Sequence, residues 1–372
     1  MNTIPNHIAN QILTIGPDYK NHRGGIGAVL EIYNGFFNPF HFIPTFRSFN
    51  NNYKKMFFFI KQVRKIFKYL RTNKQIKIVH IHSSKKGSFY RKFIIFLIAR
   101  KVYKKKVIYH VHAGEYDLFY KNSNWLTKQL IKYVVQQSDL IICLSNYWQS
   151  FFQKNFTAKR IAIVNNVVAY PKIDNKKNNS SSKIMNILFL GRIGNNKGIF
   201  DILKIIIKNK DIYNNKIKLH IGGDGDVKKL LKIIQENDLR NIVEYLGWVS
   251  NNEKNNLLLH SDIYMLPSYA EGLPVSILEA MSYGMPIIST NVGGIPEIVK
   301  HQYNGLLFQP GDIDAIENAL QFFINQPQKI EEYGNHSLEL IQPYFPKAVI
   351  EQLTQCYTSI LTPSEVSVAS HA

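Results

Sequence analysis

Short apolar runs alternate with longer amphipathic stretches through both halves of this 372-residue chain. In the first half, runs typical of buried strands lie at residues 8–15, 76–82, 107–112, 140–144 and 161–164. The second half repeats the rhythm, with runs at residues 186–190, 216–221, 243–246, 263–266 and 286–290. Near-continuous apolar strands separated by helical patterns are typical of parallel sheets built from βαβ units. The pattern therefore predicts an α/β protein with two successive parallel sheets.

A polar stretch without apolar periodicity separates the two halves at residues 171–184. Its lysines, asparagines and serines are typical of a linker between domains. We expect one domain over residues 1–170, a second over 185–345, and a helix followed by a tail over 346–372. Ligands of such sheets bind at the carboxyl ends of the strands, so this organisation predicts a cleft lined by strand-end loops.

Basic residues are concentrated in the first half of the chain. Residues 1–170 contain 27 Lys and Arg but 5 Asp and Glu, whereas the remainder contains 19 and 21. A field of one sign attracts polyanions or an anionic membrane surface, and charge alone does not choose between them. Residues 53–71 predict a basic, aromatic amphipathic helix, which suits either a membrane interface or packing on the core. A second basic tract at residues 100–106 favours the membrane.

Other bulk features indicate a cytoplasmic protein. Cys143 and Cys356 show no metal-ligand spacing and suit a reducing compartment. The start of the chain lacks the basic and apolar regions of a signal peptide. The longest apolar run, residues 93–99, is far shorter than the ~20 residues of a spanning helix. We therefore expect a cytoplasmic protein that can bind the inner face of the cell membrane peripherally.

The motif GRIGNNKG, residues 191–198, directly follows an apolar run and precedes a helical pattern. Glycines at both ends allow tight turns, and Arg192 and Lys197 place two cations beside a helix N-terminus. This combination suits a diphosphate. A basic surface loop explains the same residues, so the motif alone remains a hypothesis.

A second segment, residues 267–286, carries two glutamates eight positions apart. Glu271 lies in a loop, and Glu279 lies inside the helix that Pro274 is suited to begin. Free N–H groups at a helix start bind anions, and carboxylates accept two hydrogen bonds from neighbouring sugar hydroxyls. Compensation of the helix dipole, or a plain surface position, is the alternative for either glutamate.

Taken together, these motifs resemble a family 4 retaining glycosyltransferase of the GT-B fold, one of the glycosyl transferases of group 1. The resemblance rests on residues 191–198, the Glu271 and Glu279 pair, GGDGD at 222–226, NVGGIPEIV at 291–299 and NGLL at 304–307. It implies two Rossmann-like domains facing a central cleft, with a C-terminal helix that crosses back to the first domain. GGDGD does not match the G-x-G-x-x-G of NAD enzymes, and the sequence contains no ATPase P-loop motif.

The resemblance also implies roles for individual residues. Arg192 and Lys197 would hold the donor diphosphate, Glu279 the ribose and Glu271 the transferred sugar. His112 would touch the donor sugar from the first domain. Further donor contacts are expected at Gly25, Gly272, Leu273, Val275, Gly247 and Val249.

Two His-x-His pairs end strands of the first domain, His80 with His82 and His110 with His112. Alternate residues of a strand face the same side, so the members of each pair share a face. Such pairs can chelate a metal, but no carboxylate or cysteine accompanies them at zinc-like spacing. The sequence therefore favours structural roles for His80 and His110 and predicts no metal site.

The implied reaction transfers a hexose from a UDP- or GDP-sugar to a hydroxyl, with retention at the anomeric carbon. The expected acceptor is a glycan or lipid-linked glycan of a bacterial surface polysaccharide. Because cations and helix N-termini can stabilise the leaving diphosphate, we expect no cofactor and no essential metal. Another GT-B enzyme acting on sugar nucleotides, such as an epimerase or a phosphorylase, shares the fold but leaves the paired motifs unexplained. A nucleic-acid-binding protein explains the charge alone, so nucleic acid is not expected as a partner.

Overall fold

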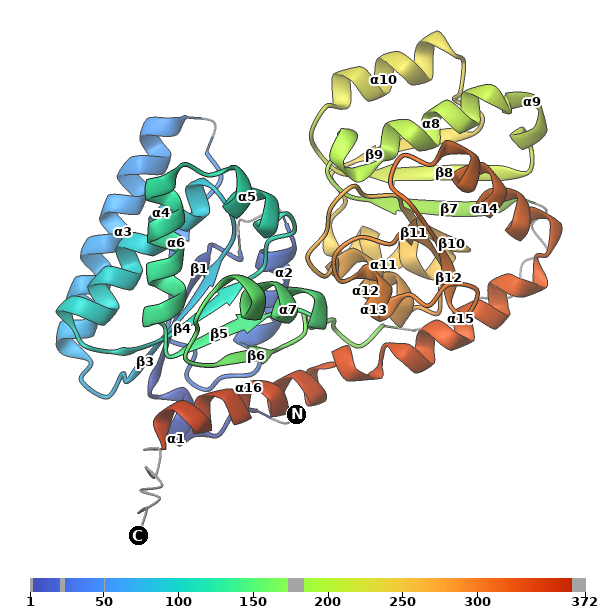
Figure 1. Ribbon diagram of the computed structural model, residues 1–372. Helices are drawn as coiled ribbons and strands as arrows, with labels where there is room; N and C mark the ends of the chain where they lie inside the picture. The colour runs from blue at the N-terminus through green and yellow to red at the C-terminus, as the bar shows by residue number, and fades with distance from the viewer. Residues whose placement is uncertain (1–2, 21–23, 50, 173–183, 363–372) are drawn as a thin grey trace. The chain divides into compact units, whose positions relative to one another are not determined.

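The chain divides into two compact units, one of residues 1–167 with 346–372 and one of residues 168–345 (Figure 1). The computed structural model describes residues 3–20, 24–49, 51–172 and 184–362. The expected linker at 171–184 therefore lies almost entirely outside the described residues. Each unit is an α/β structure with one parallel sheet, as the alternating pattern predicts.

The first unit contains a six-stranded parallel sheet in the order β2-β1-β3-β4-β5-β6. Strand order reverses between β1 and β3, so connections leave this point in opposite directions. The strands are β1 (Ile12–Pro17), β2 (Phe42–Phe46), β3 (Ile78–Ser83), β4 (Lys106–Val111), β5 (Leu140–Cys143) and β6 (Ile161–Ile163).

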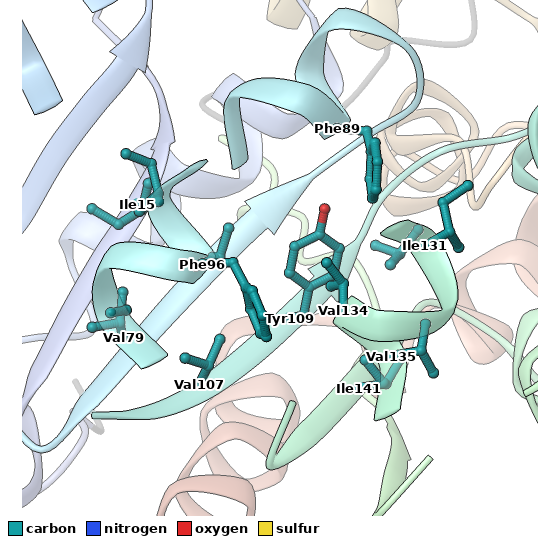
Figure 2. Packing of buried hydrophobic residues seen from close by; sticks show 14 of the residues in the cluster. Ile15, Val79, Phe89, Phe96, Val107, Tyr109, Ile131, Val134, Val135 and Ile141 are labelled. Carbon is teal, nitrogen blue, oxygen red and sulfur yellow. The ribbon is translucent and has the colours of Figure 1, made fainter. Parts of the chain in front are cut away.

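Helices cover both faces of this sheet and bury its apolar side chains. Figure 2 shows Phe89 and Phe96 of α4 and Val134 of α6 packed around Tyr109 of β4. The last helix, α16, belongs to this unit although it follows residue 345 in the chain. The helices are α1 (Asn6–Ala9), α2 (Gly25–Asn34), α3 (Asn52–Thr72), α4 (Gly87–Leu97), the π-helix η1 (Ile98–Val102), α5 (Tyr116–Asn122), α6 (Trp125–Gln137), α7 (Asn146–Asn155) and α16 (Pro346–Leu361).

The second unit repeats the architecture with a sheet in the order β12-β11-β10-β7-β8-β9. Its strands are β7 (Met185–Leu190), β8 (Ile217–Gly222), β9 (Val243–Gly247), β10 (Ile263–Leu266), β11 (Ile287–Thr290) and β12 (Gly305–Phe308). Its helices are the 3-10 turn η2 (Asn195–Lys197), α8 (Ile199–Lys208), α9 (Lys210–Tyr213), α10 (Val227–Glu236), α11 (Asn251–His260), α12 (Val275–Ser282), α13 (Ile295–Ile298), α14 (Ile313–Asn325), α15 (Gln328–Leu340) and the 3-10 turn η3 (Gln342–Tyr344). Among all described helices, none combines the length and apolar composition that a bilayer span requires.

The first strand differs from its predicted bounds. Ile8 and Ala9, expected as the start of the strand, belong to α1, and β1 continues through Gly16 and Pro17, two residues beyond the predicted run. Gly16 allows close packing there, because a Cβ at this position would lie 2.3 Å from Leu30 Cδ1. The sequence pattern also missed β12 and β2, and β2 contains Pro44 at the edge of its sheet.

A buried lysine lies beneath the carboxyl end of the first sheet. Lys92 of α4 is 2% exposed, and its Nζ donates a hydrogen bond to Thr45 Oγ1. That hydroxyl in turn donates to the Gly16 carbonyl at 3.1 Å. Burial, with a smaller contribution from Arg91, lowers the pKa of Lys92 well below its usual value. The charged form of this side chain therefore opposes folding.

We predict that Lys92→Met stabilises the protein at neutral pH and flattens its pH dependence. The pKa of Lys92 is lowered in the folded protein and is about 10.4 in the unfolded chain. At any pH between these two pKa values, the unfolded chain therefore binds more protons at Lys92 than the folded protein does. Wild-type stability should thus rise with pH in that window by up to about 1.4 kcal/mol per unit. Urea unfolding across this pH range tests it, with Lys65→Met on the exposed face of α3 as control. A methionine variant less stable than wild type at pH 7 would contradict this assignment.

Candidate active site

The second sheet reverses its strand order between β7 and β10. These strands are neighbours, but β7 leads on to β8 on one side and β10 to β11 on the other. The loops that follow them, residues 191–198 and 267–274, therefore begin on either side of one point at the carboxyl edge. Ligands of open parallel sheets bind at such a switch point.

The loop at residues 191–198 is fixed by backbone pairing with the GGDGD segment at 222–226. Ile193 donates its N–H to the Asp224 carbonyl at 2.6 Å and accepts from the Asp226 N–H at 3.0 Å. The Ile193 side chain is 2% exposed and anchors the loop in the core. The GGDGD segment thus supports the basic loop, a role that differs from that of a dinucleotide fingerprint.

The two loops at the switch point meet through backbone and side chains. Gly198 adopts φ +70°, and a Cβ there would lie 2.1 Å from the Pro267 carbonyl oxygen. Tyr269 donates its N–H to the Asn196 carbonyl at 3.0 Å. Lys197 and Glu271 are held face to face as a result.

Lys197 Nζ forms an ion pair with Glu271 Oε1 across the switch point. The same carboxylate oxygen accepts a hydrogen bond from Ser268 Oγ at 2.7 Å. Glu271 is 8% exposed, whereas Lys197 is more accessible. A buried carboxylate is therefore oriented by a serine and paired with a more accessible cation.

The other two charged residues predicted for the site, Arg192 and Glu279, form no ion pair with Lys197 or Glu271 in the described part of the chain. Arg192 is exposed and forms no ion pair with any residue that the structure describes. Glu279 of α12 pairs with Lys254 Nζ of α11 at 2.6 Å. Between the glutamates, Tyr264 donates its hydroxyl to the Leu190 carbonyl at 2.9 Å, and burial raises its pKa.

The other positions predicted in this unit lie in loops at the strand ends and beside the start of α12. Leu273 and Val275 have buried side chains there. Gly272 accepts a hydrogen bond from the Gly294 N–H at 2.9 Å. Gly247 accepts from the Gly223 N–H at 2.7 Å, and Val249 packs over Gly222. These loops all follow strands of one sheet, at its carboxyl edge.

Two predicted residues belong to the first unit. Gly25 is the exposed first residue of α2. His112 follows β4, where its Nε2 lies 2.8 Å from His82 Nδ1, and Asn166 provides a further hydrogen bond. Burial lowers the pKa of His112 to about 3, so its imidazole is neutral at physiological pH. Its contact with a donor sugar stays a prediction.

The sequence did not single out Ser268 or Lys254. Ser268 lies three residues before Glu271, within the motif, so its position gave a local signal. No local sequence signal marked Lys254, because it lies on α11, which precedes β10. Only the folded arrangement brings Lys254 to Glu279 of α12.

Two Rossmann-like units, with a lysine-bearing and a glutamate-bearing loop at the switch point of the second sheet, are the architecture of the GT-B class of glycosyltransferases. Family models match most of the chain: Glycosyltransferase Family 4 over residues 27–169 and Glycosyl transferases group 1 over residues 172–338. The protein belongs to this glycosyltransferase family, as the sequence resemblance predicted.

Characterised and uncharacterised relatives agree with this assignment. The chain is 30% identical to the UDP-Gal:alpha-D-GlcNAc-diphosphoundecaprenol alpha-1,3-galactosyltransferase of Escherichia coli, over 70% of this chain and 69% of that protein. It is 29% identical to an uncharacterized 41.2 kDa protein in the cps region of Klebsiella pneumoniae, over 73% of this chain and 77% of that one. The sucrose-phosphate synthase of Thermosynechococcus elongatus shares the fold at a TM-score of 0.75 and 17% identity, covering 94% of this chain and 99% of that chain.

We predict that Gly198→Ala destabilises the second unit, whereas Gly194→Ala does not. A methyl group at Gly198 meets the Pro267 carbonyl and occupies a left-handed backbone conformation, while at Gly194 it meets nothing within 4 Å. Left-handed strain and the clash together should cost about 2 kcal/mol, or roughly 4–8 °C in the unfolding midpoint. Thermal unfolding of both variants measures the difference. Equal midpoints would show that the two loops are not held together as described.

Proposed function

We propose that this glycosyltransferase moves a hexose from a UDP- or GDP-sugar to a hydroxyl of a lipid-linked glycan in bacterial surface polysaccharide synthesis. The observation that carries the proposal is the Lys197–Glu271 pair at the switch point of the second sheet. This arrangement offers a cation for a diphosphate beside an oriented carboxylate for sugar hydroxyls. The name of the Escherichia coli relative supports both a UDP-sugar donor and a diphosphoundecaprenol-linked acceptor.

Binding of the donor would exchange partners within the pair. A diphosphate carries more negative charge than a carboxylate and accepts charge-assisted hydrogen bonds from Lys197 and the exposed Arg192. Glu271 is then free to accept sugar hydroxyls while Ser268 still holds its Oε1. Glu279 would accept the ribose hydroxyls and is oriented by Lys254 in the same way.

Catalysis would rest on charge stabilisation rather than on a protein nucleophile. As the bond to the anomeric carbon breaks, negative charge develops on the leaving diphosphate, where Arg192, Lys197 and the N–H groups at the start of α12 can stabilise it. Attack from the same face, with the leaving oxygen accepting the proton of the acceptor, retains the anomeric configuration. Because these groups supply the positive charge, we propose that no Mg²⁺ or other cofactor is needed for the chemistry.

A donor screen tests this proposal through release of the nucleoside diphosphate with lipid-linked acceptors. Glu271→Gln and Lys197→Ala should each lower turnover by ~10²–10³, the cost of removing one group that stabilises a transition state. Lys208→Ala removes a lysine paired with Glu317 elsewhere in the same unit and should turn over like wild type. Added Mg²⁺ or Mn²⁺ should leave the rate nearly unchanged.

Near wild-type turnover in either active-site variant would remove that residue from the mechanism. Strict dependence on Mg²⁺ would contradict the assignment of leaving-group stabilisation to the side chains. Conversion of the sugar nucleotide without an acceptor, or release of a sugar phosphate, would favour an epimerase or a phosphorylase instead.

We further propose that helix α3 of the first unit docks on an anionic membrane. One apolar face of α3, with Ile66 and Leu70, is buried in the core. Phe67, which follows Ile66 on this helix, is 37% exposed. The helix also carries a second apolar stripe, spaced i, i+3, i+4 and i+7, that is open to solvent: Tyr53 (78% exposed), Met56 (58%), Phe57 (73%) and Ile60 (45%).

Basic residues flank this stripe on the same helix. Lys54, Lys61, Arg64 and Lys65 are all exposed. Apolar side chains that enter the headgroup region, ringed by lysine and arginine, are typical of helices that lie in a membrane interface. Each basic residue near an anionic surface contributes about 1 kcal/mol, so a few of them give reversible binding that would bring the enzyme to a lipid-linked acceptor.

Vesicle flotation tests the docking proposal. Wild-type protein should float with phosphatidylglycerol vesicles at low salt, and the bound fraction should fall as the salt concentration rises. It should not float with phosphatidylcholine vesicles. The double variant Tyr53→Ala, Phe57→Ala should lose most binding, whereas Leu231→Ala, at an exposed apolar position on α10, should keep it. Equal binding to neutral vesicles, or no loss in the double variant, would contradict the proposal. Binding to DNA but not to vesicles would indicate that the basic residues of the first unit bind nucleic acid instead.

A further inference from the structure

Four histidines converge at the carboxyl ends of β3 and β4 in the first unit. The two strands pair in parallel register with His82 opposite His110, so the two His-x-His pairs lie side by side. His80, His82 and His110 are fully buried, and His112 is partly exposed. Their rings stack with centroids 4.0 Å apart for His110 and His112 and 4.3 Å apart for His80 and His82.

Hydrogen bonds account for only part of the nitrogen atoms of this cluster. His80 Nδ1 contacts the Tyr357 hydroxyl of α16 at 2.7 Å, and His80 Nε2 contacts His110 Nδ1 at 3.2 Å. His82 Nδ1 contacts His112 Nε2 at 2.8 Å. The Nε2 atoms of His82 and His110 are buried and have no hydrogen-bond partner within the described part of the chain. Unpaired buried polar atoms of this kind call for a ligand or a water.

One choice of tautomers satisfies every one of these contacts. If each ring carries its proton on Nδ1, His80 donates to Tyr357, His110 donates to His80, and His82 donates to His112. The Nε2 atoms of His82 and His110 then present lone pairs into the cluster. The opposite choice would bury two N–H donors without acceptors, which native structures rarely tolerate.

We propose that His80, His82 and His110 bind one zinc ion through their ring nitrogens. One ring nitrogen from each of the three histidines lies within 4.8 Å of the others. His82 and His110 would bind through their unpaired Nε2 atoms, and His80 through Nε2 once that atom gives up its contact with His110 Nδ1. Zinc bound by imidazole at 2.0–2.1 Å in tetrahedral geometry needs nitrogens about 3.3 Å apart, so small side-chain rotations complete the site. The fourth position is left to water.

The surroundings of the cluster suit a zinc site. Zinc-bound histidines usually donate the other ring N–H to a nearby acceptor, as His80 does to Tyr357 and His82 to His112.

The zinc site lies in the first unit, and its ligand His82 contacts His112, the residue predicted to touch the donor sugar. Its three nitrogen ligands favour zinc over the oxygen-seeking Mg²⁺. Through Tyr357, a bound ion would tie strands β3 and β4 to the last helix, α16. The inference departs from the sequence analysis, which predicted no metal, because only the register of β3 and β4 brings the third ligand to the other two.

Zinc content and stability of the full, untagged chain test the inference directly. After dialysis against a chelator, the protein should take up about one zinc per chain. Zinc should raise the unfolding midpoint by several degrees, as binding to the folded state requires. Cobalt(II) in its place should give the visible absorption of a tetrahedral nitrogen site.

Three variants separate the site from adventitious binding. His110→Gln should abolish uptake, and Tyr357→Phe, which keeps all ligands, should weaken zinc about 10–100-fold. His41→Gln, a partly buried histidine of the same unit bonded to Tyr69, should bind like wild type. Unchanged stability and no uptake in wild type, or undiminished uptake in folded His110→Gln, would overturn the inference. Neither readout depends on turnover, so failure here leaves the proposed glycosyl transfer standing.

Discussion

The ion pair between Lys197 and Glu271 is the contact on which the account of this enzyme depends. It exists because strand order reverses between β7 and β10, which sends two loops out from the same point of the sheet edge. A glycine that can adopt a left-handed conformation lets the loops approach, and Ser268 fixes the carboxylate. The carboxylate of Glu271 is thus held by two partners, the lysine and the serine. The strand order therefore brings the two loops together, and the residues of these loops supply the charged groups that meet there.

The two units share an architecture but differ in charge and in surface. Residues 1–170 carry all of the basic excess, whereas the second unit, which holds the acidic residues of the site, is nearly balanced. The first unit also exposes aromatic side chains on α3 while it buries a lysine and three histidines near the carboxyl edge of its sheet. These features fit a unit that meets a charged surface and a second unit that handles a soluble nucleotide donor.

Much of the fold was predictable because parallel strands are buried on both faces and therefore appear in the sequence as near-continuous apolar runs. Ten of the strands were predicted in this way, and GRIGNNKG and the Glu271 segment marked the loops of the site. The pattern failed at β2, which contains a proline, at β12, and at α1, a short helix that precedes β1 within the run predicted as one strand. Contacts between distant segments, such as Lys254 with Glu279 and His82 with His110, follow from sheet order and register, which no local pattern encodes.

Equilibrium binding of UDP to the full chain tests the central claim most directly. If Lys197 leaves Glu271 to bind the diphosphate, Lys197→Met should weaken the affinity for UDP by roughly 10–100-fold, which corresponds to the loss of one charge-assisted hydrogen bond. Lys208→Met removes a lysine that is likewise paired with a glutamate and should bind UDP like wild type. Equal affinity of wild type and Lys197→Met would show that the pair is a structural contact and that the diphosphate binds elsewhere.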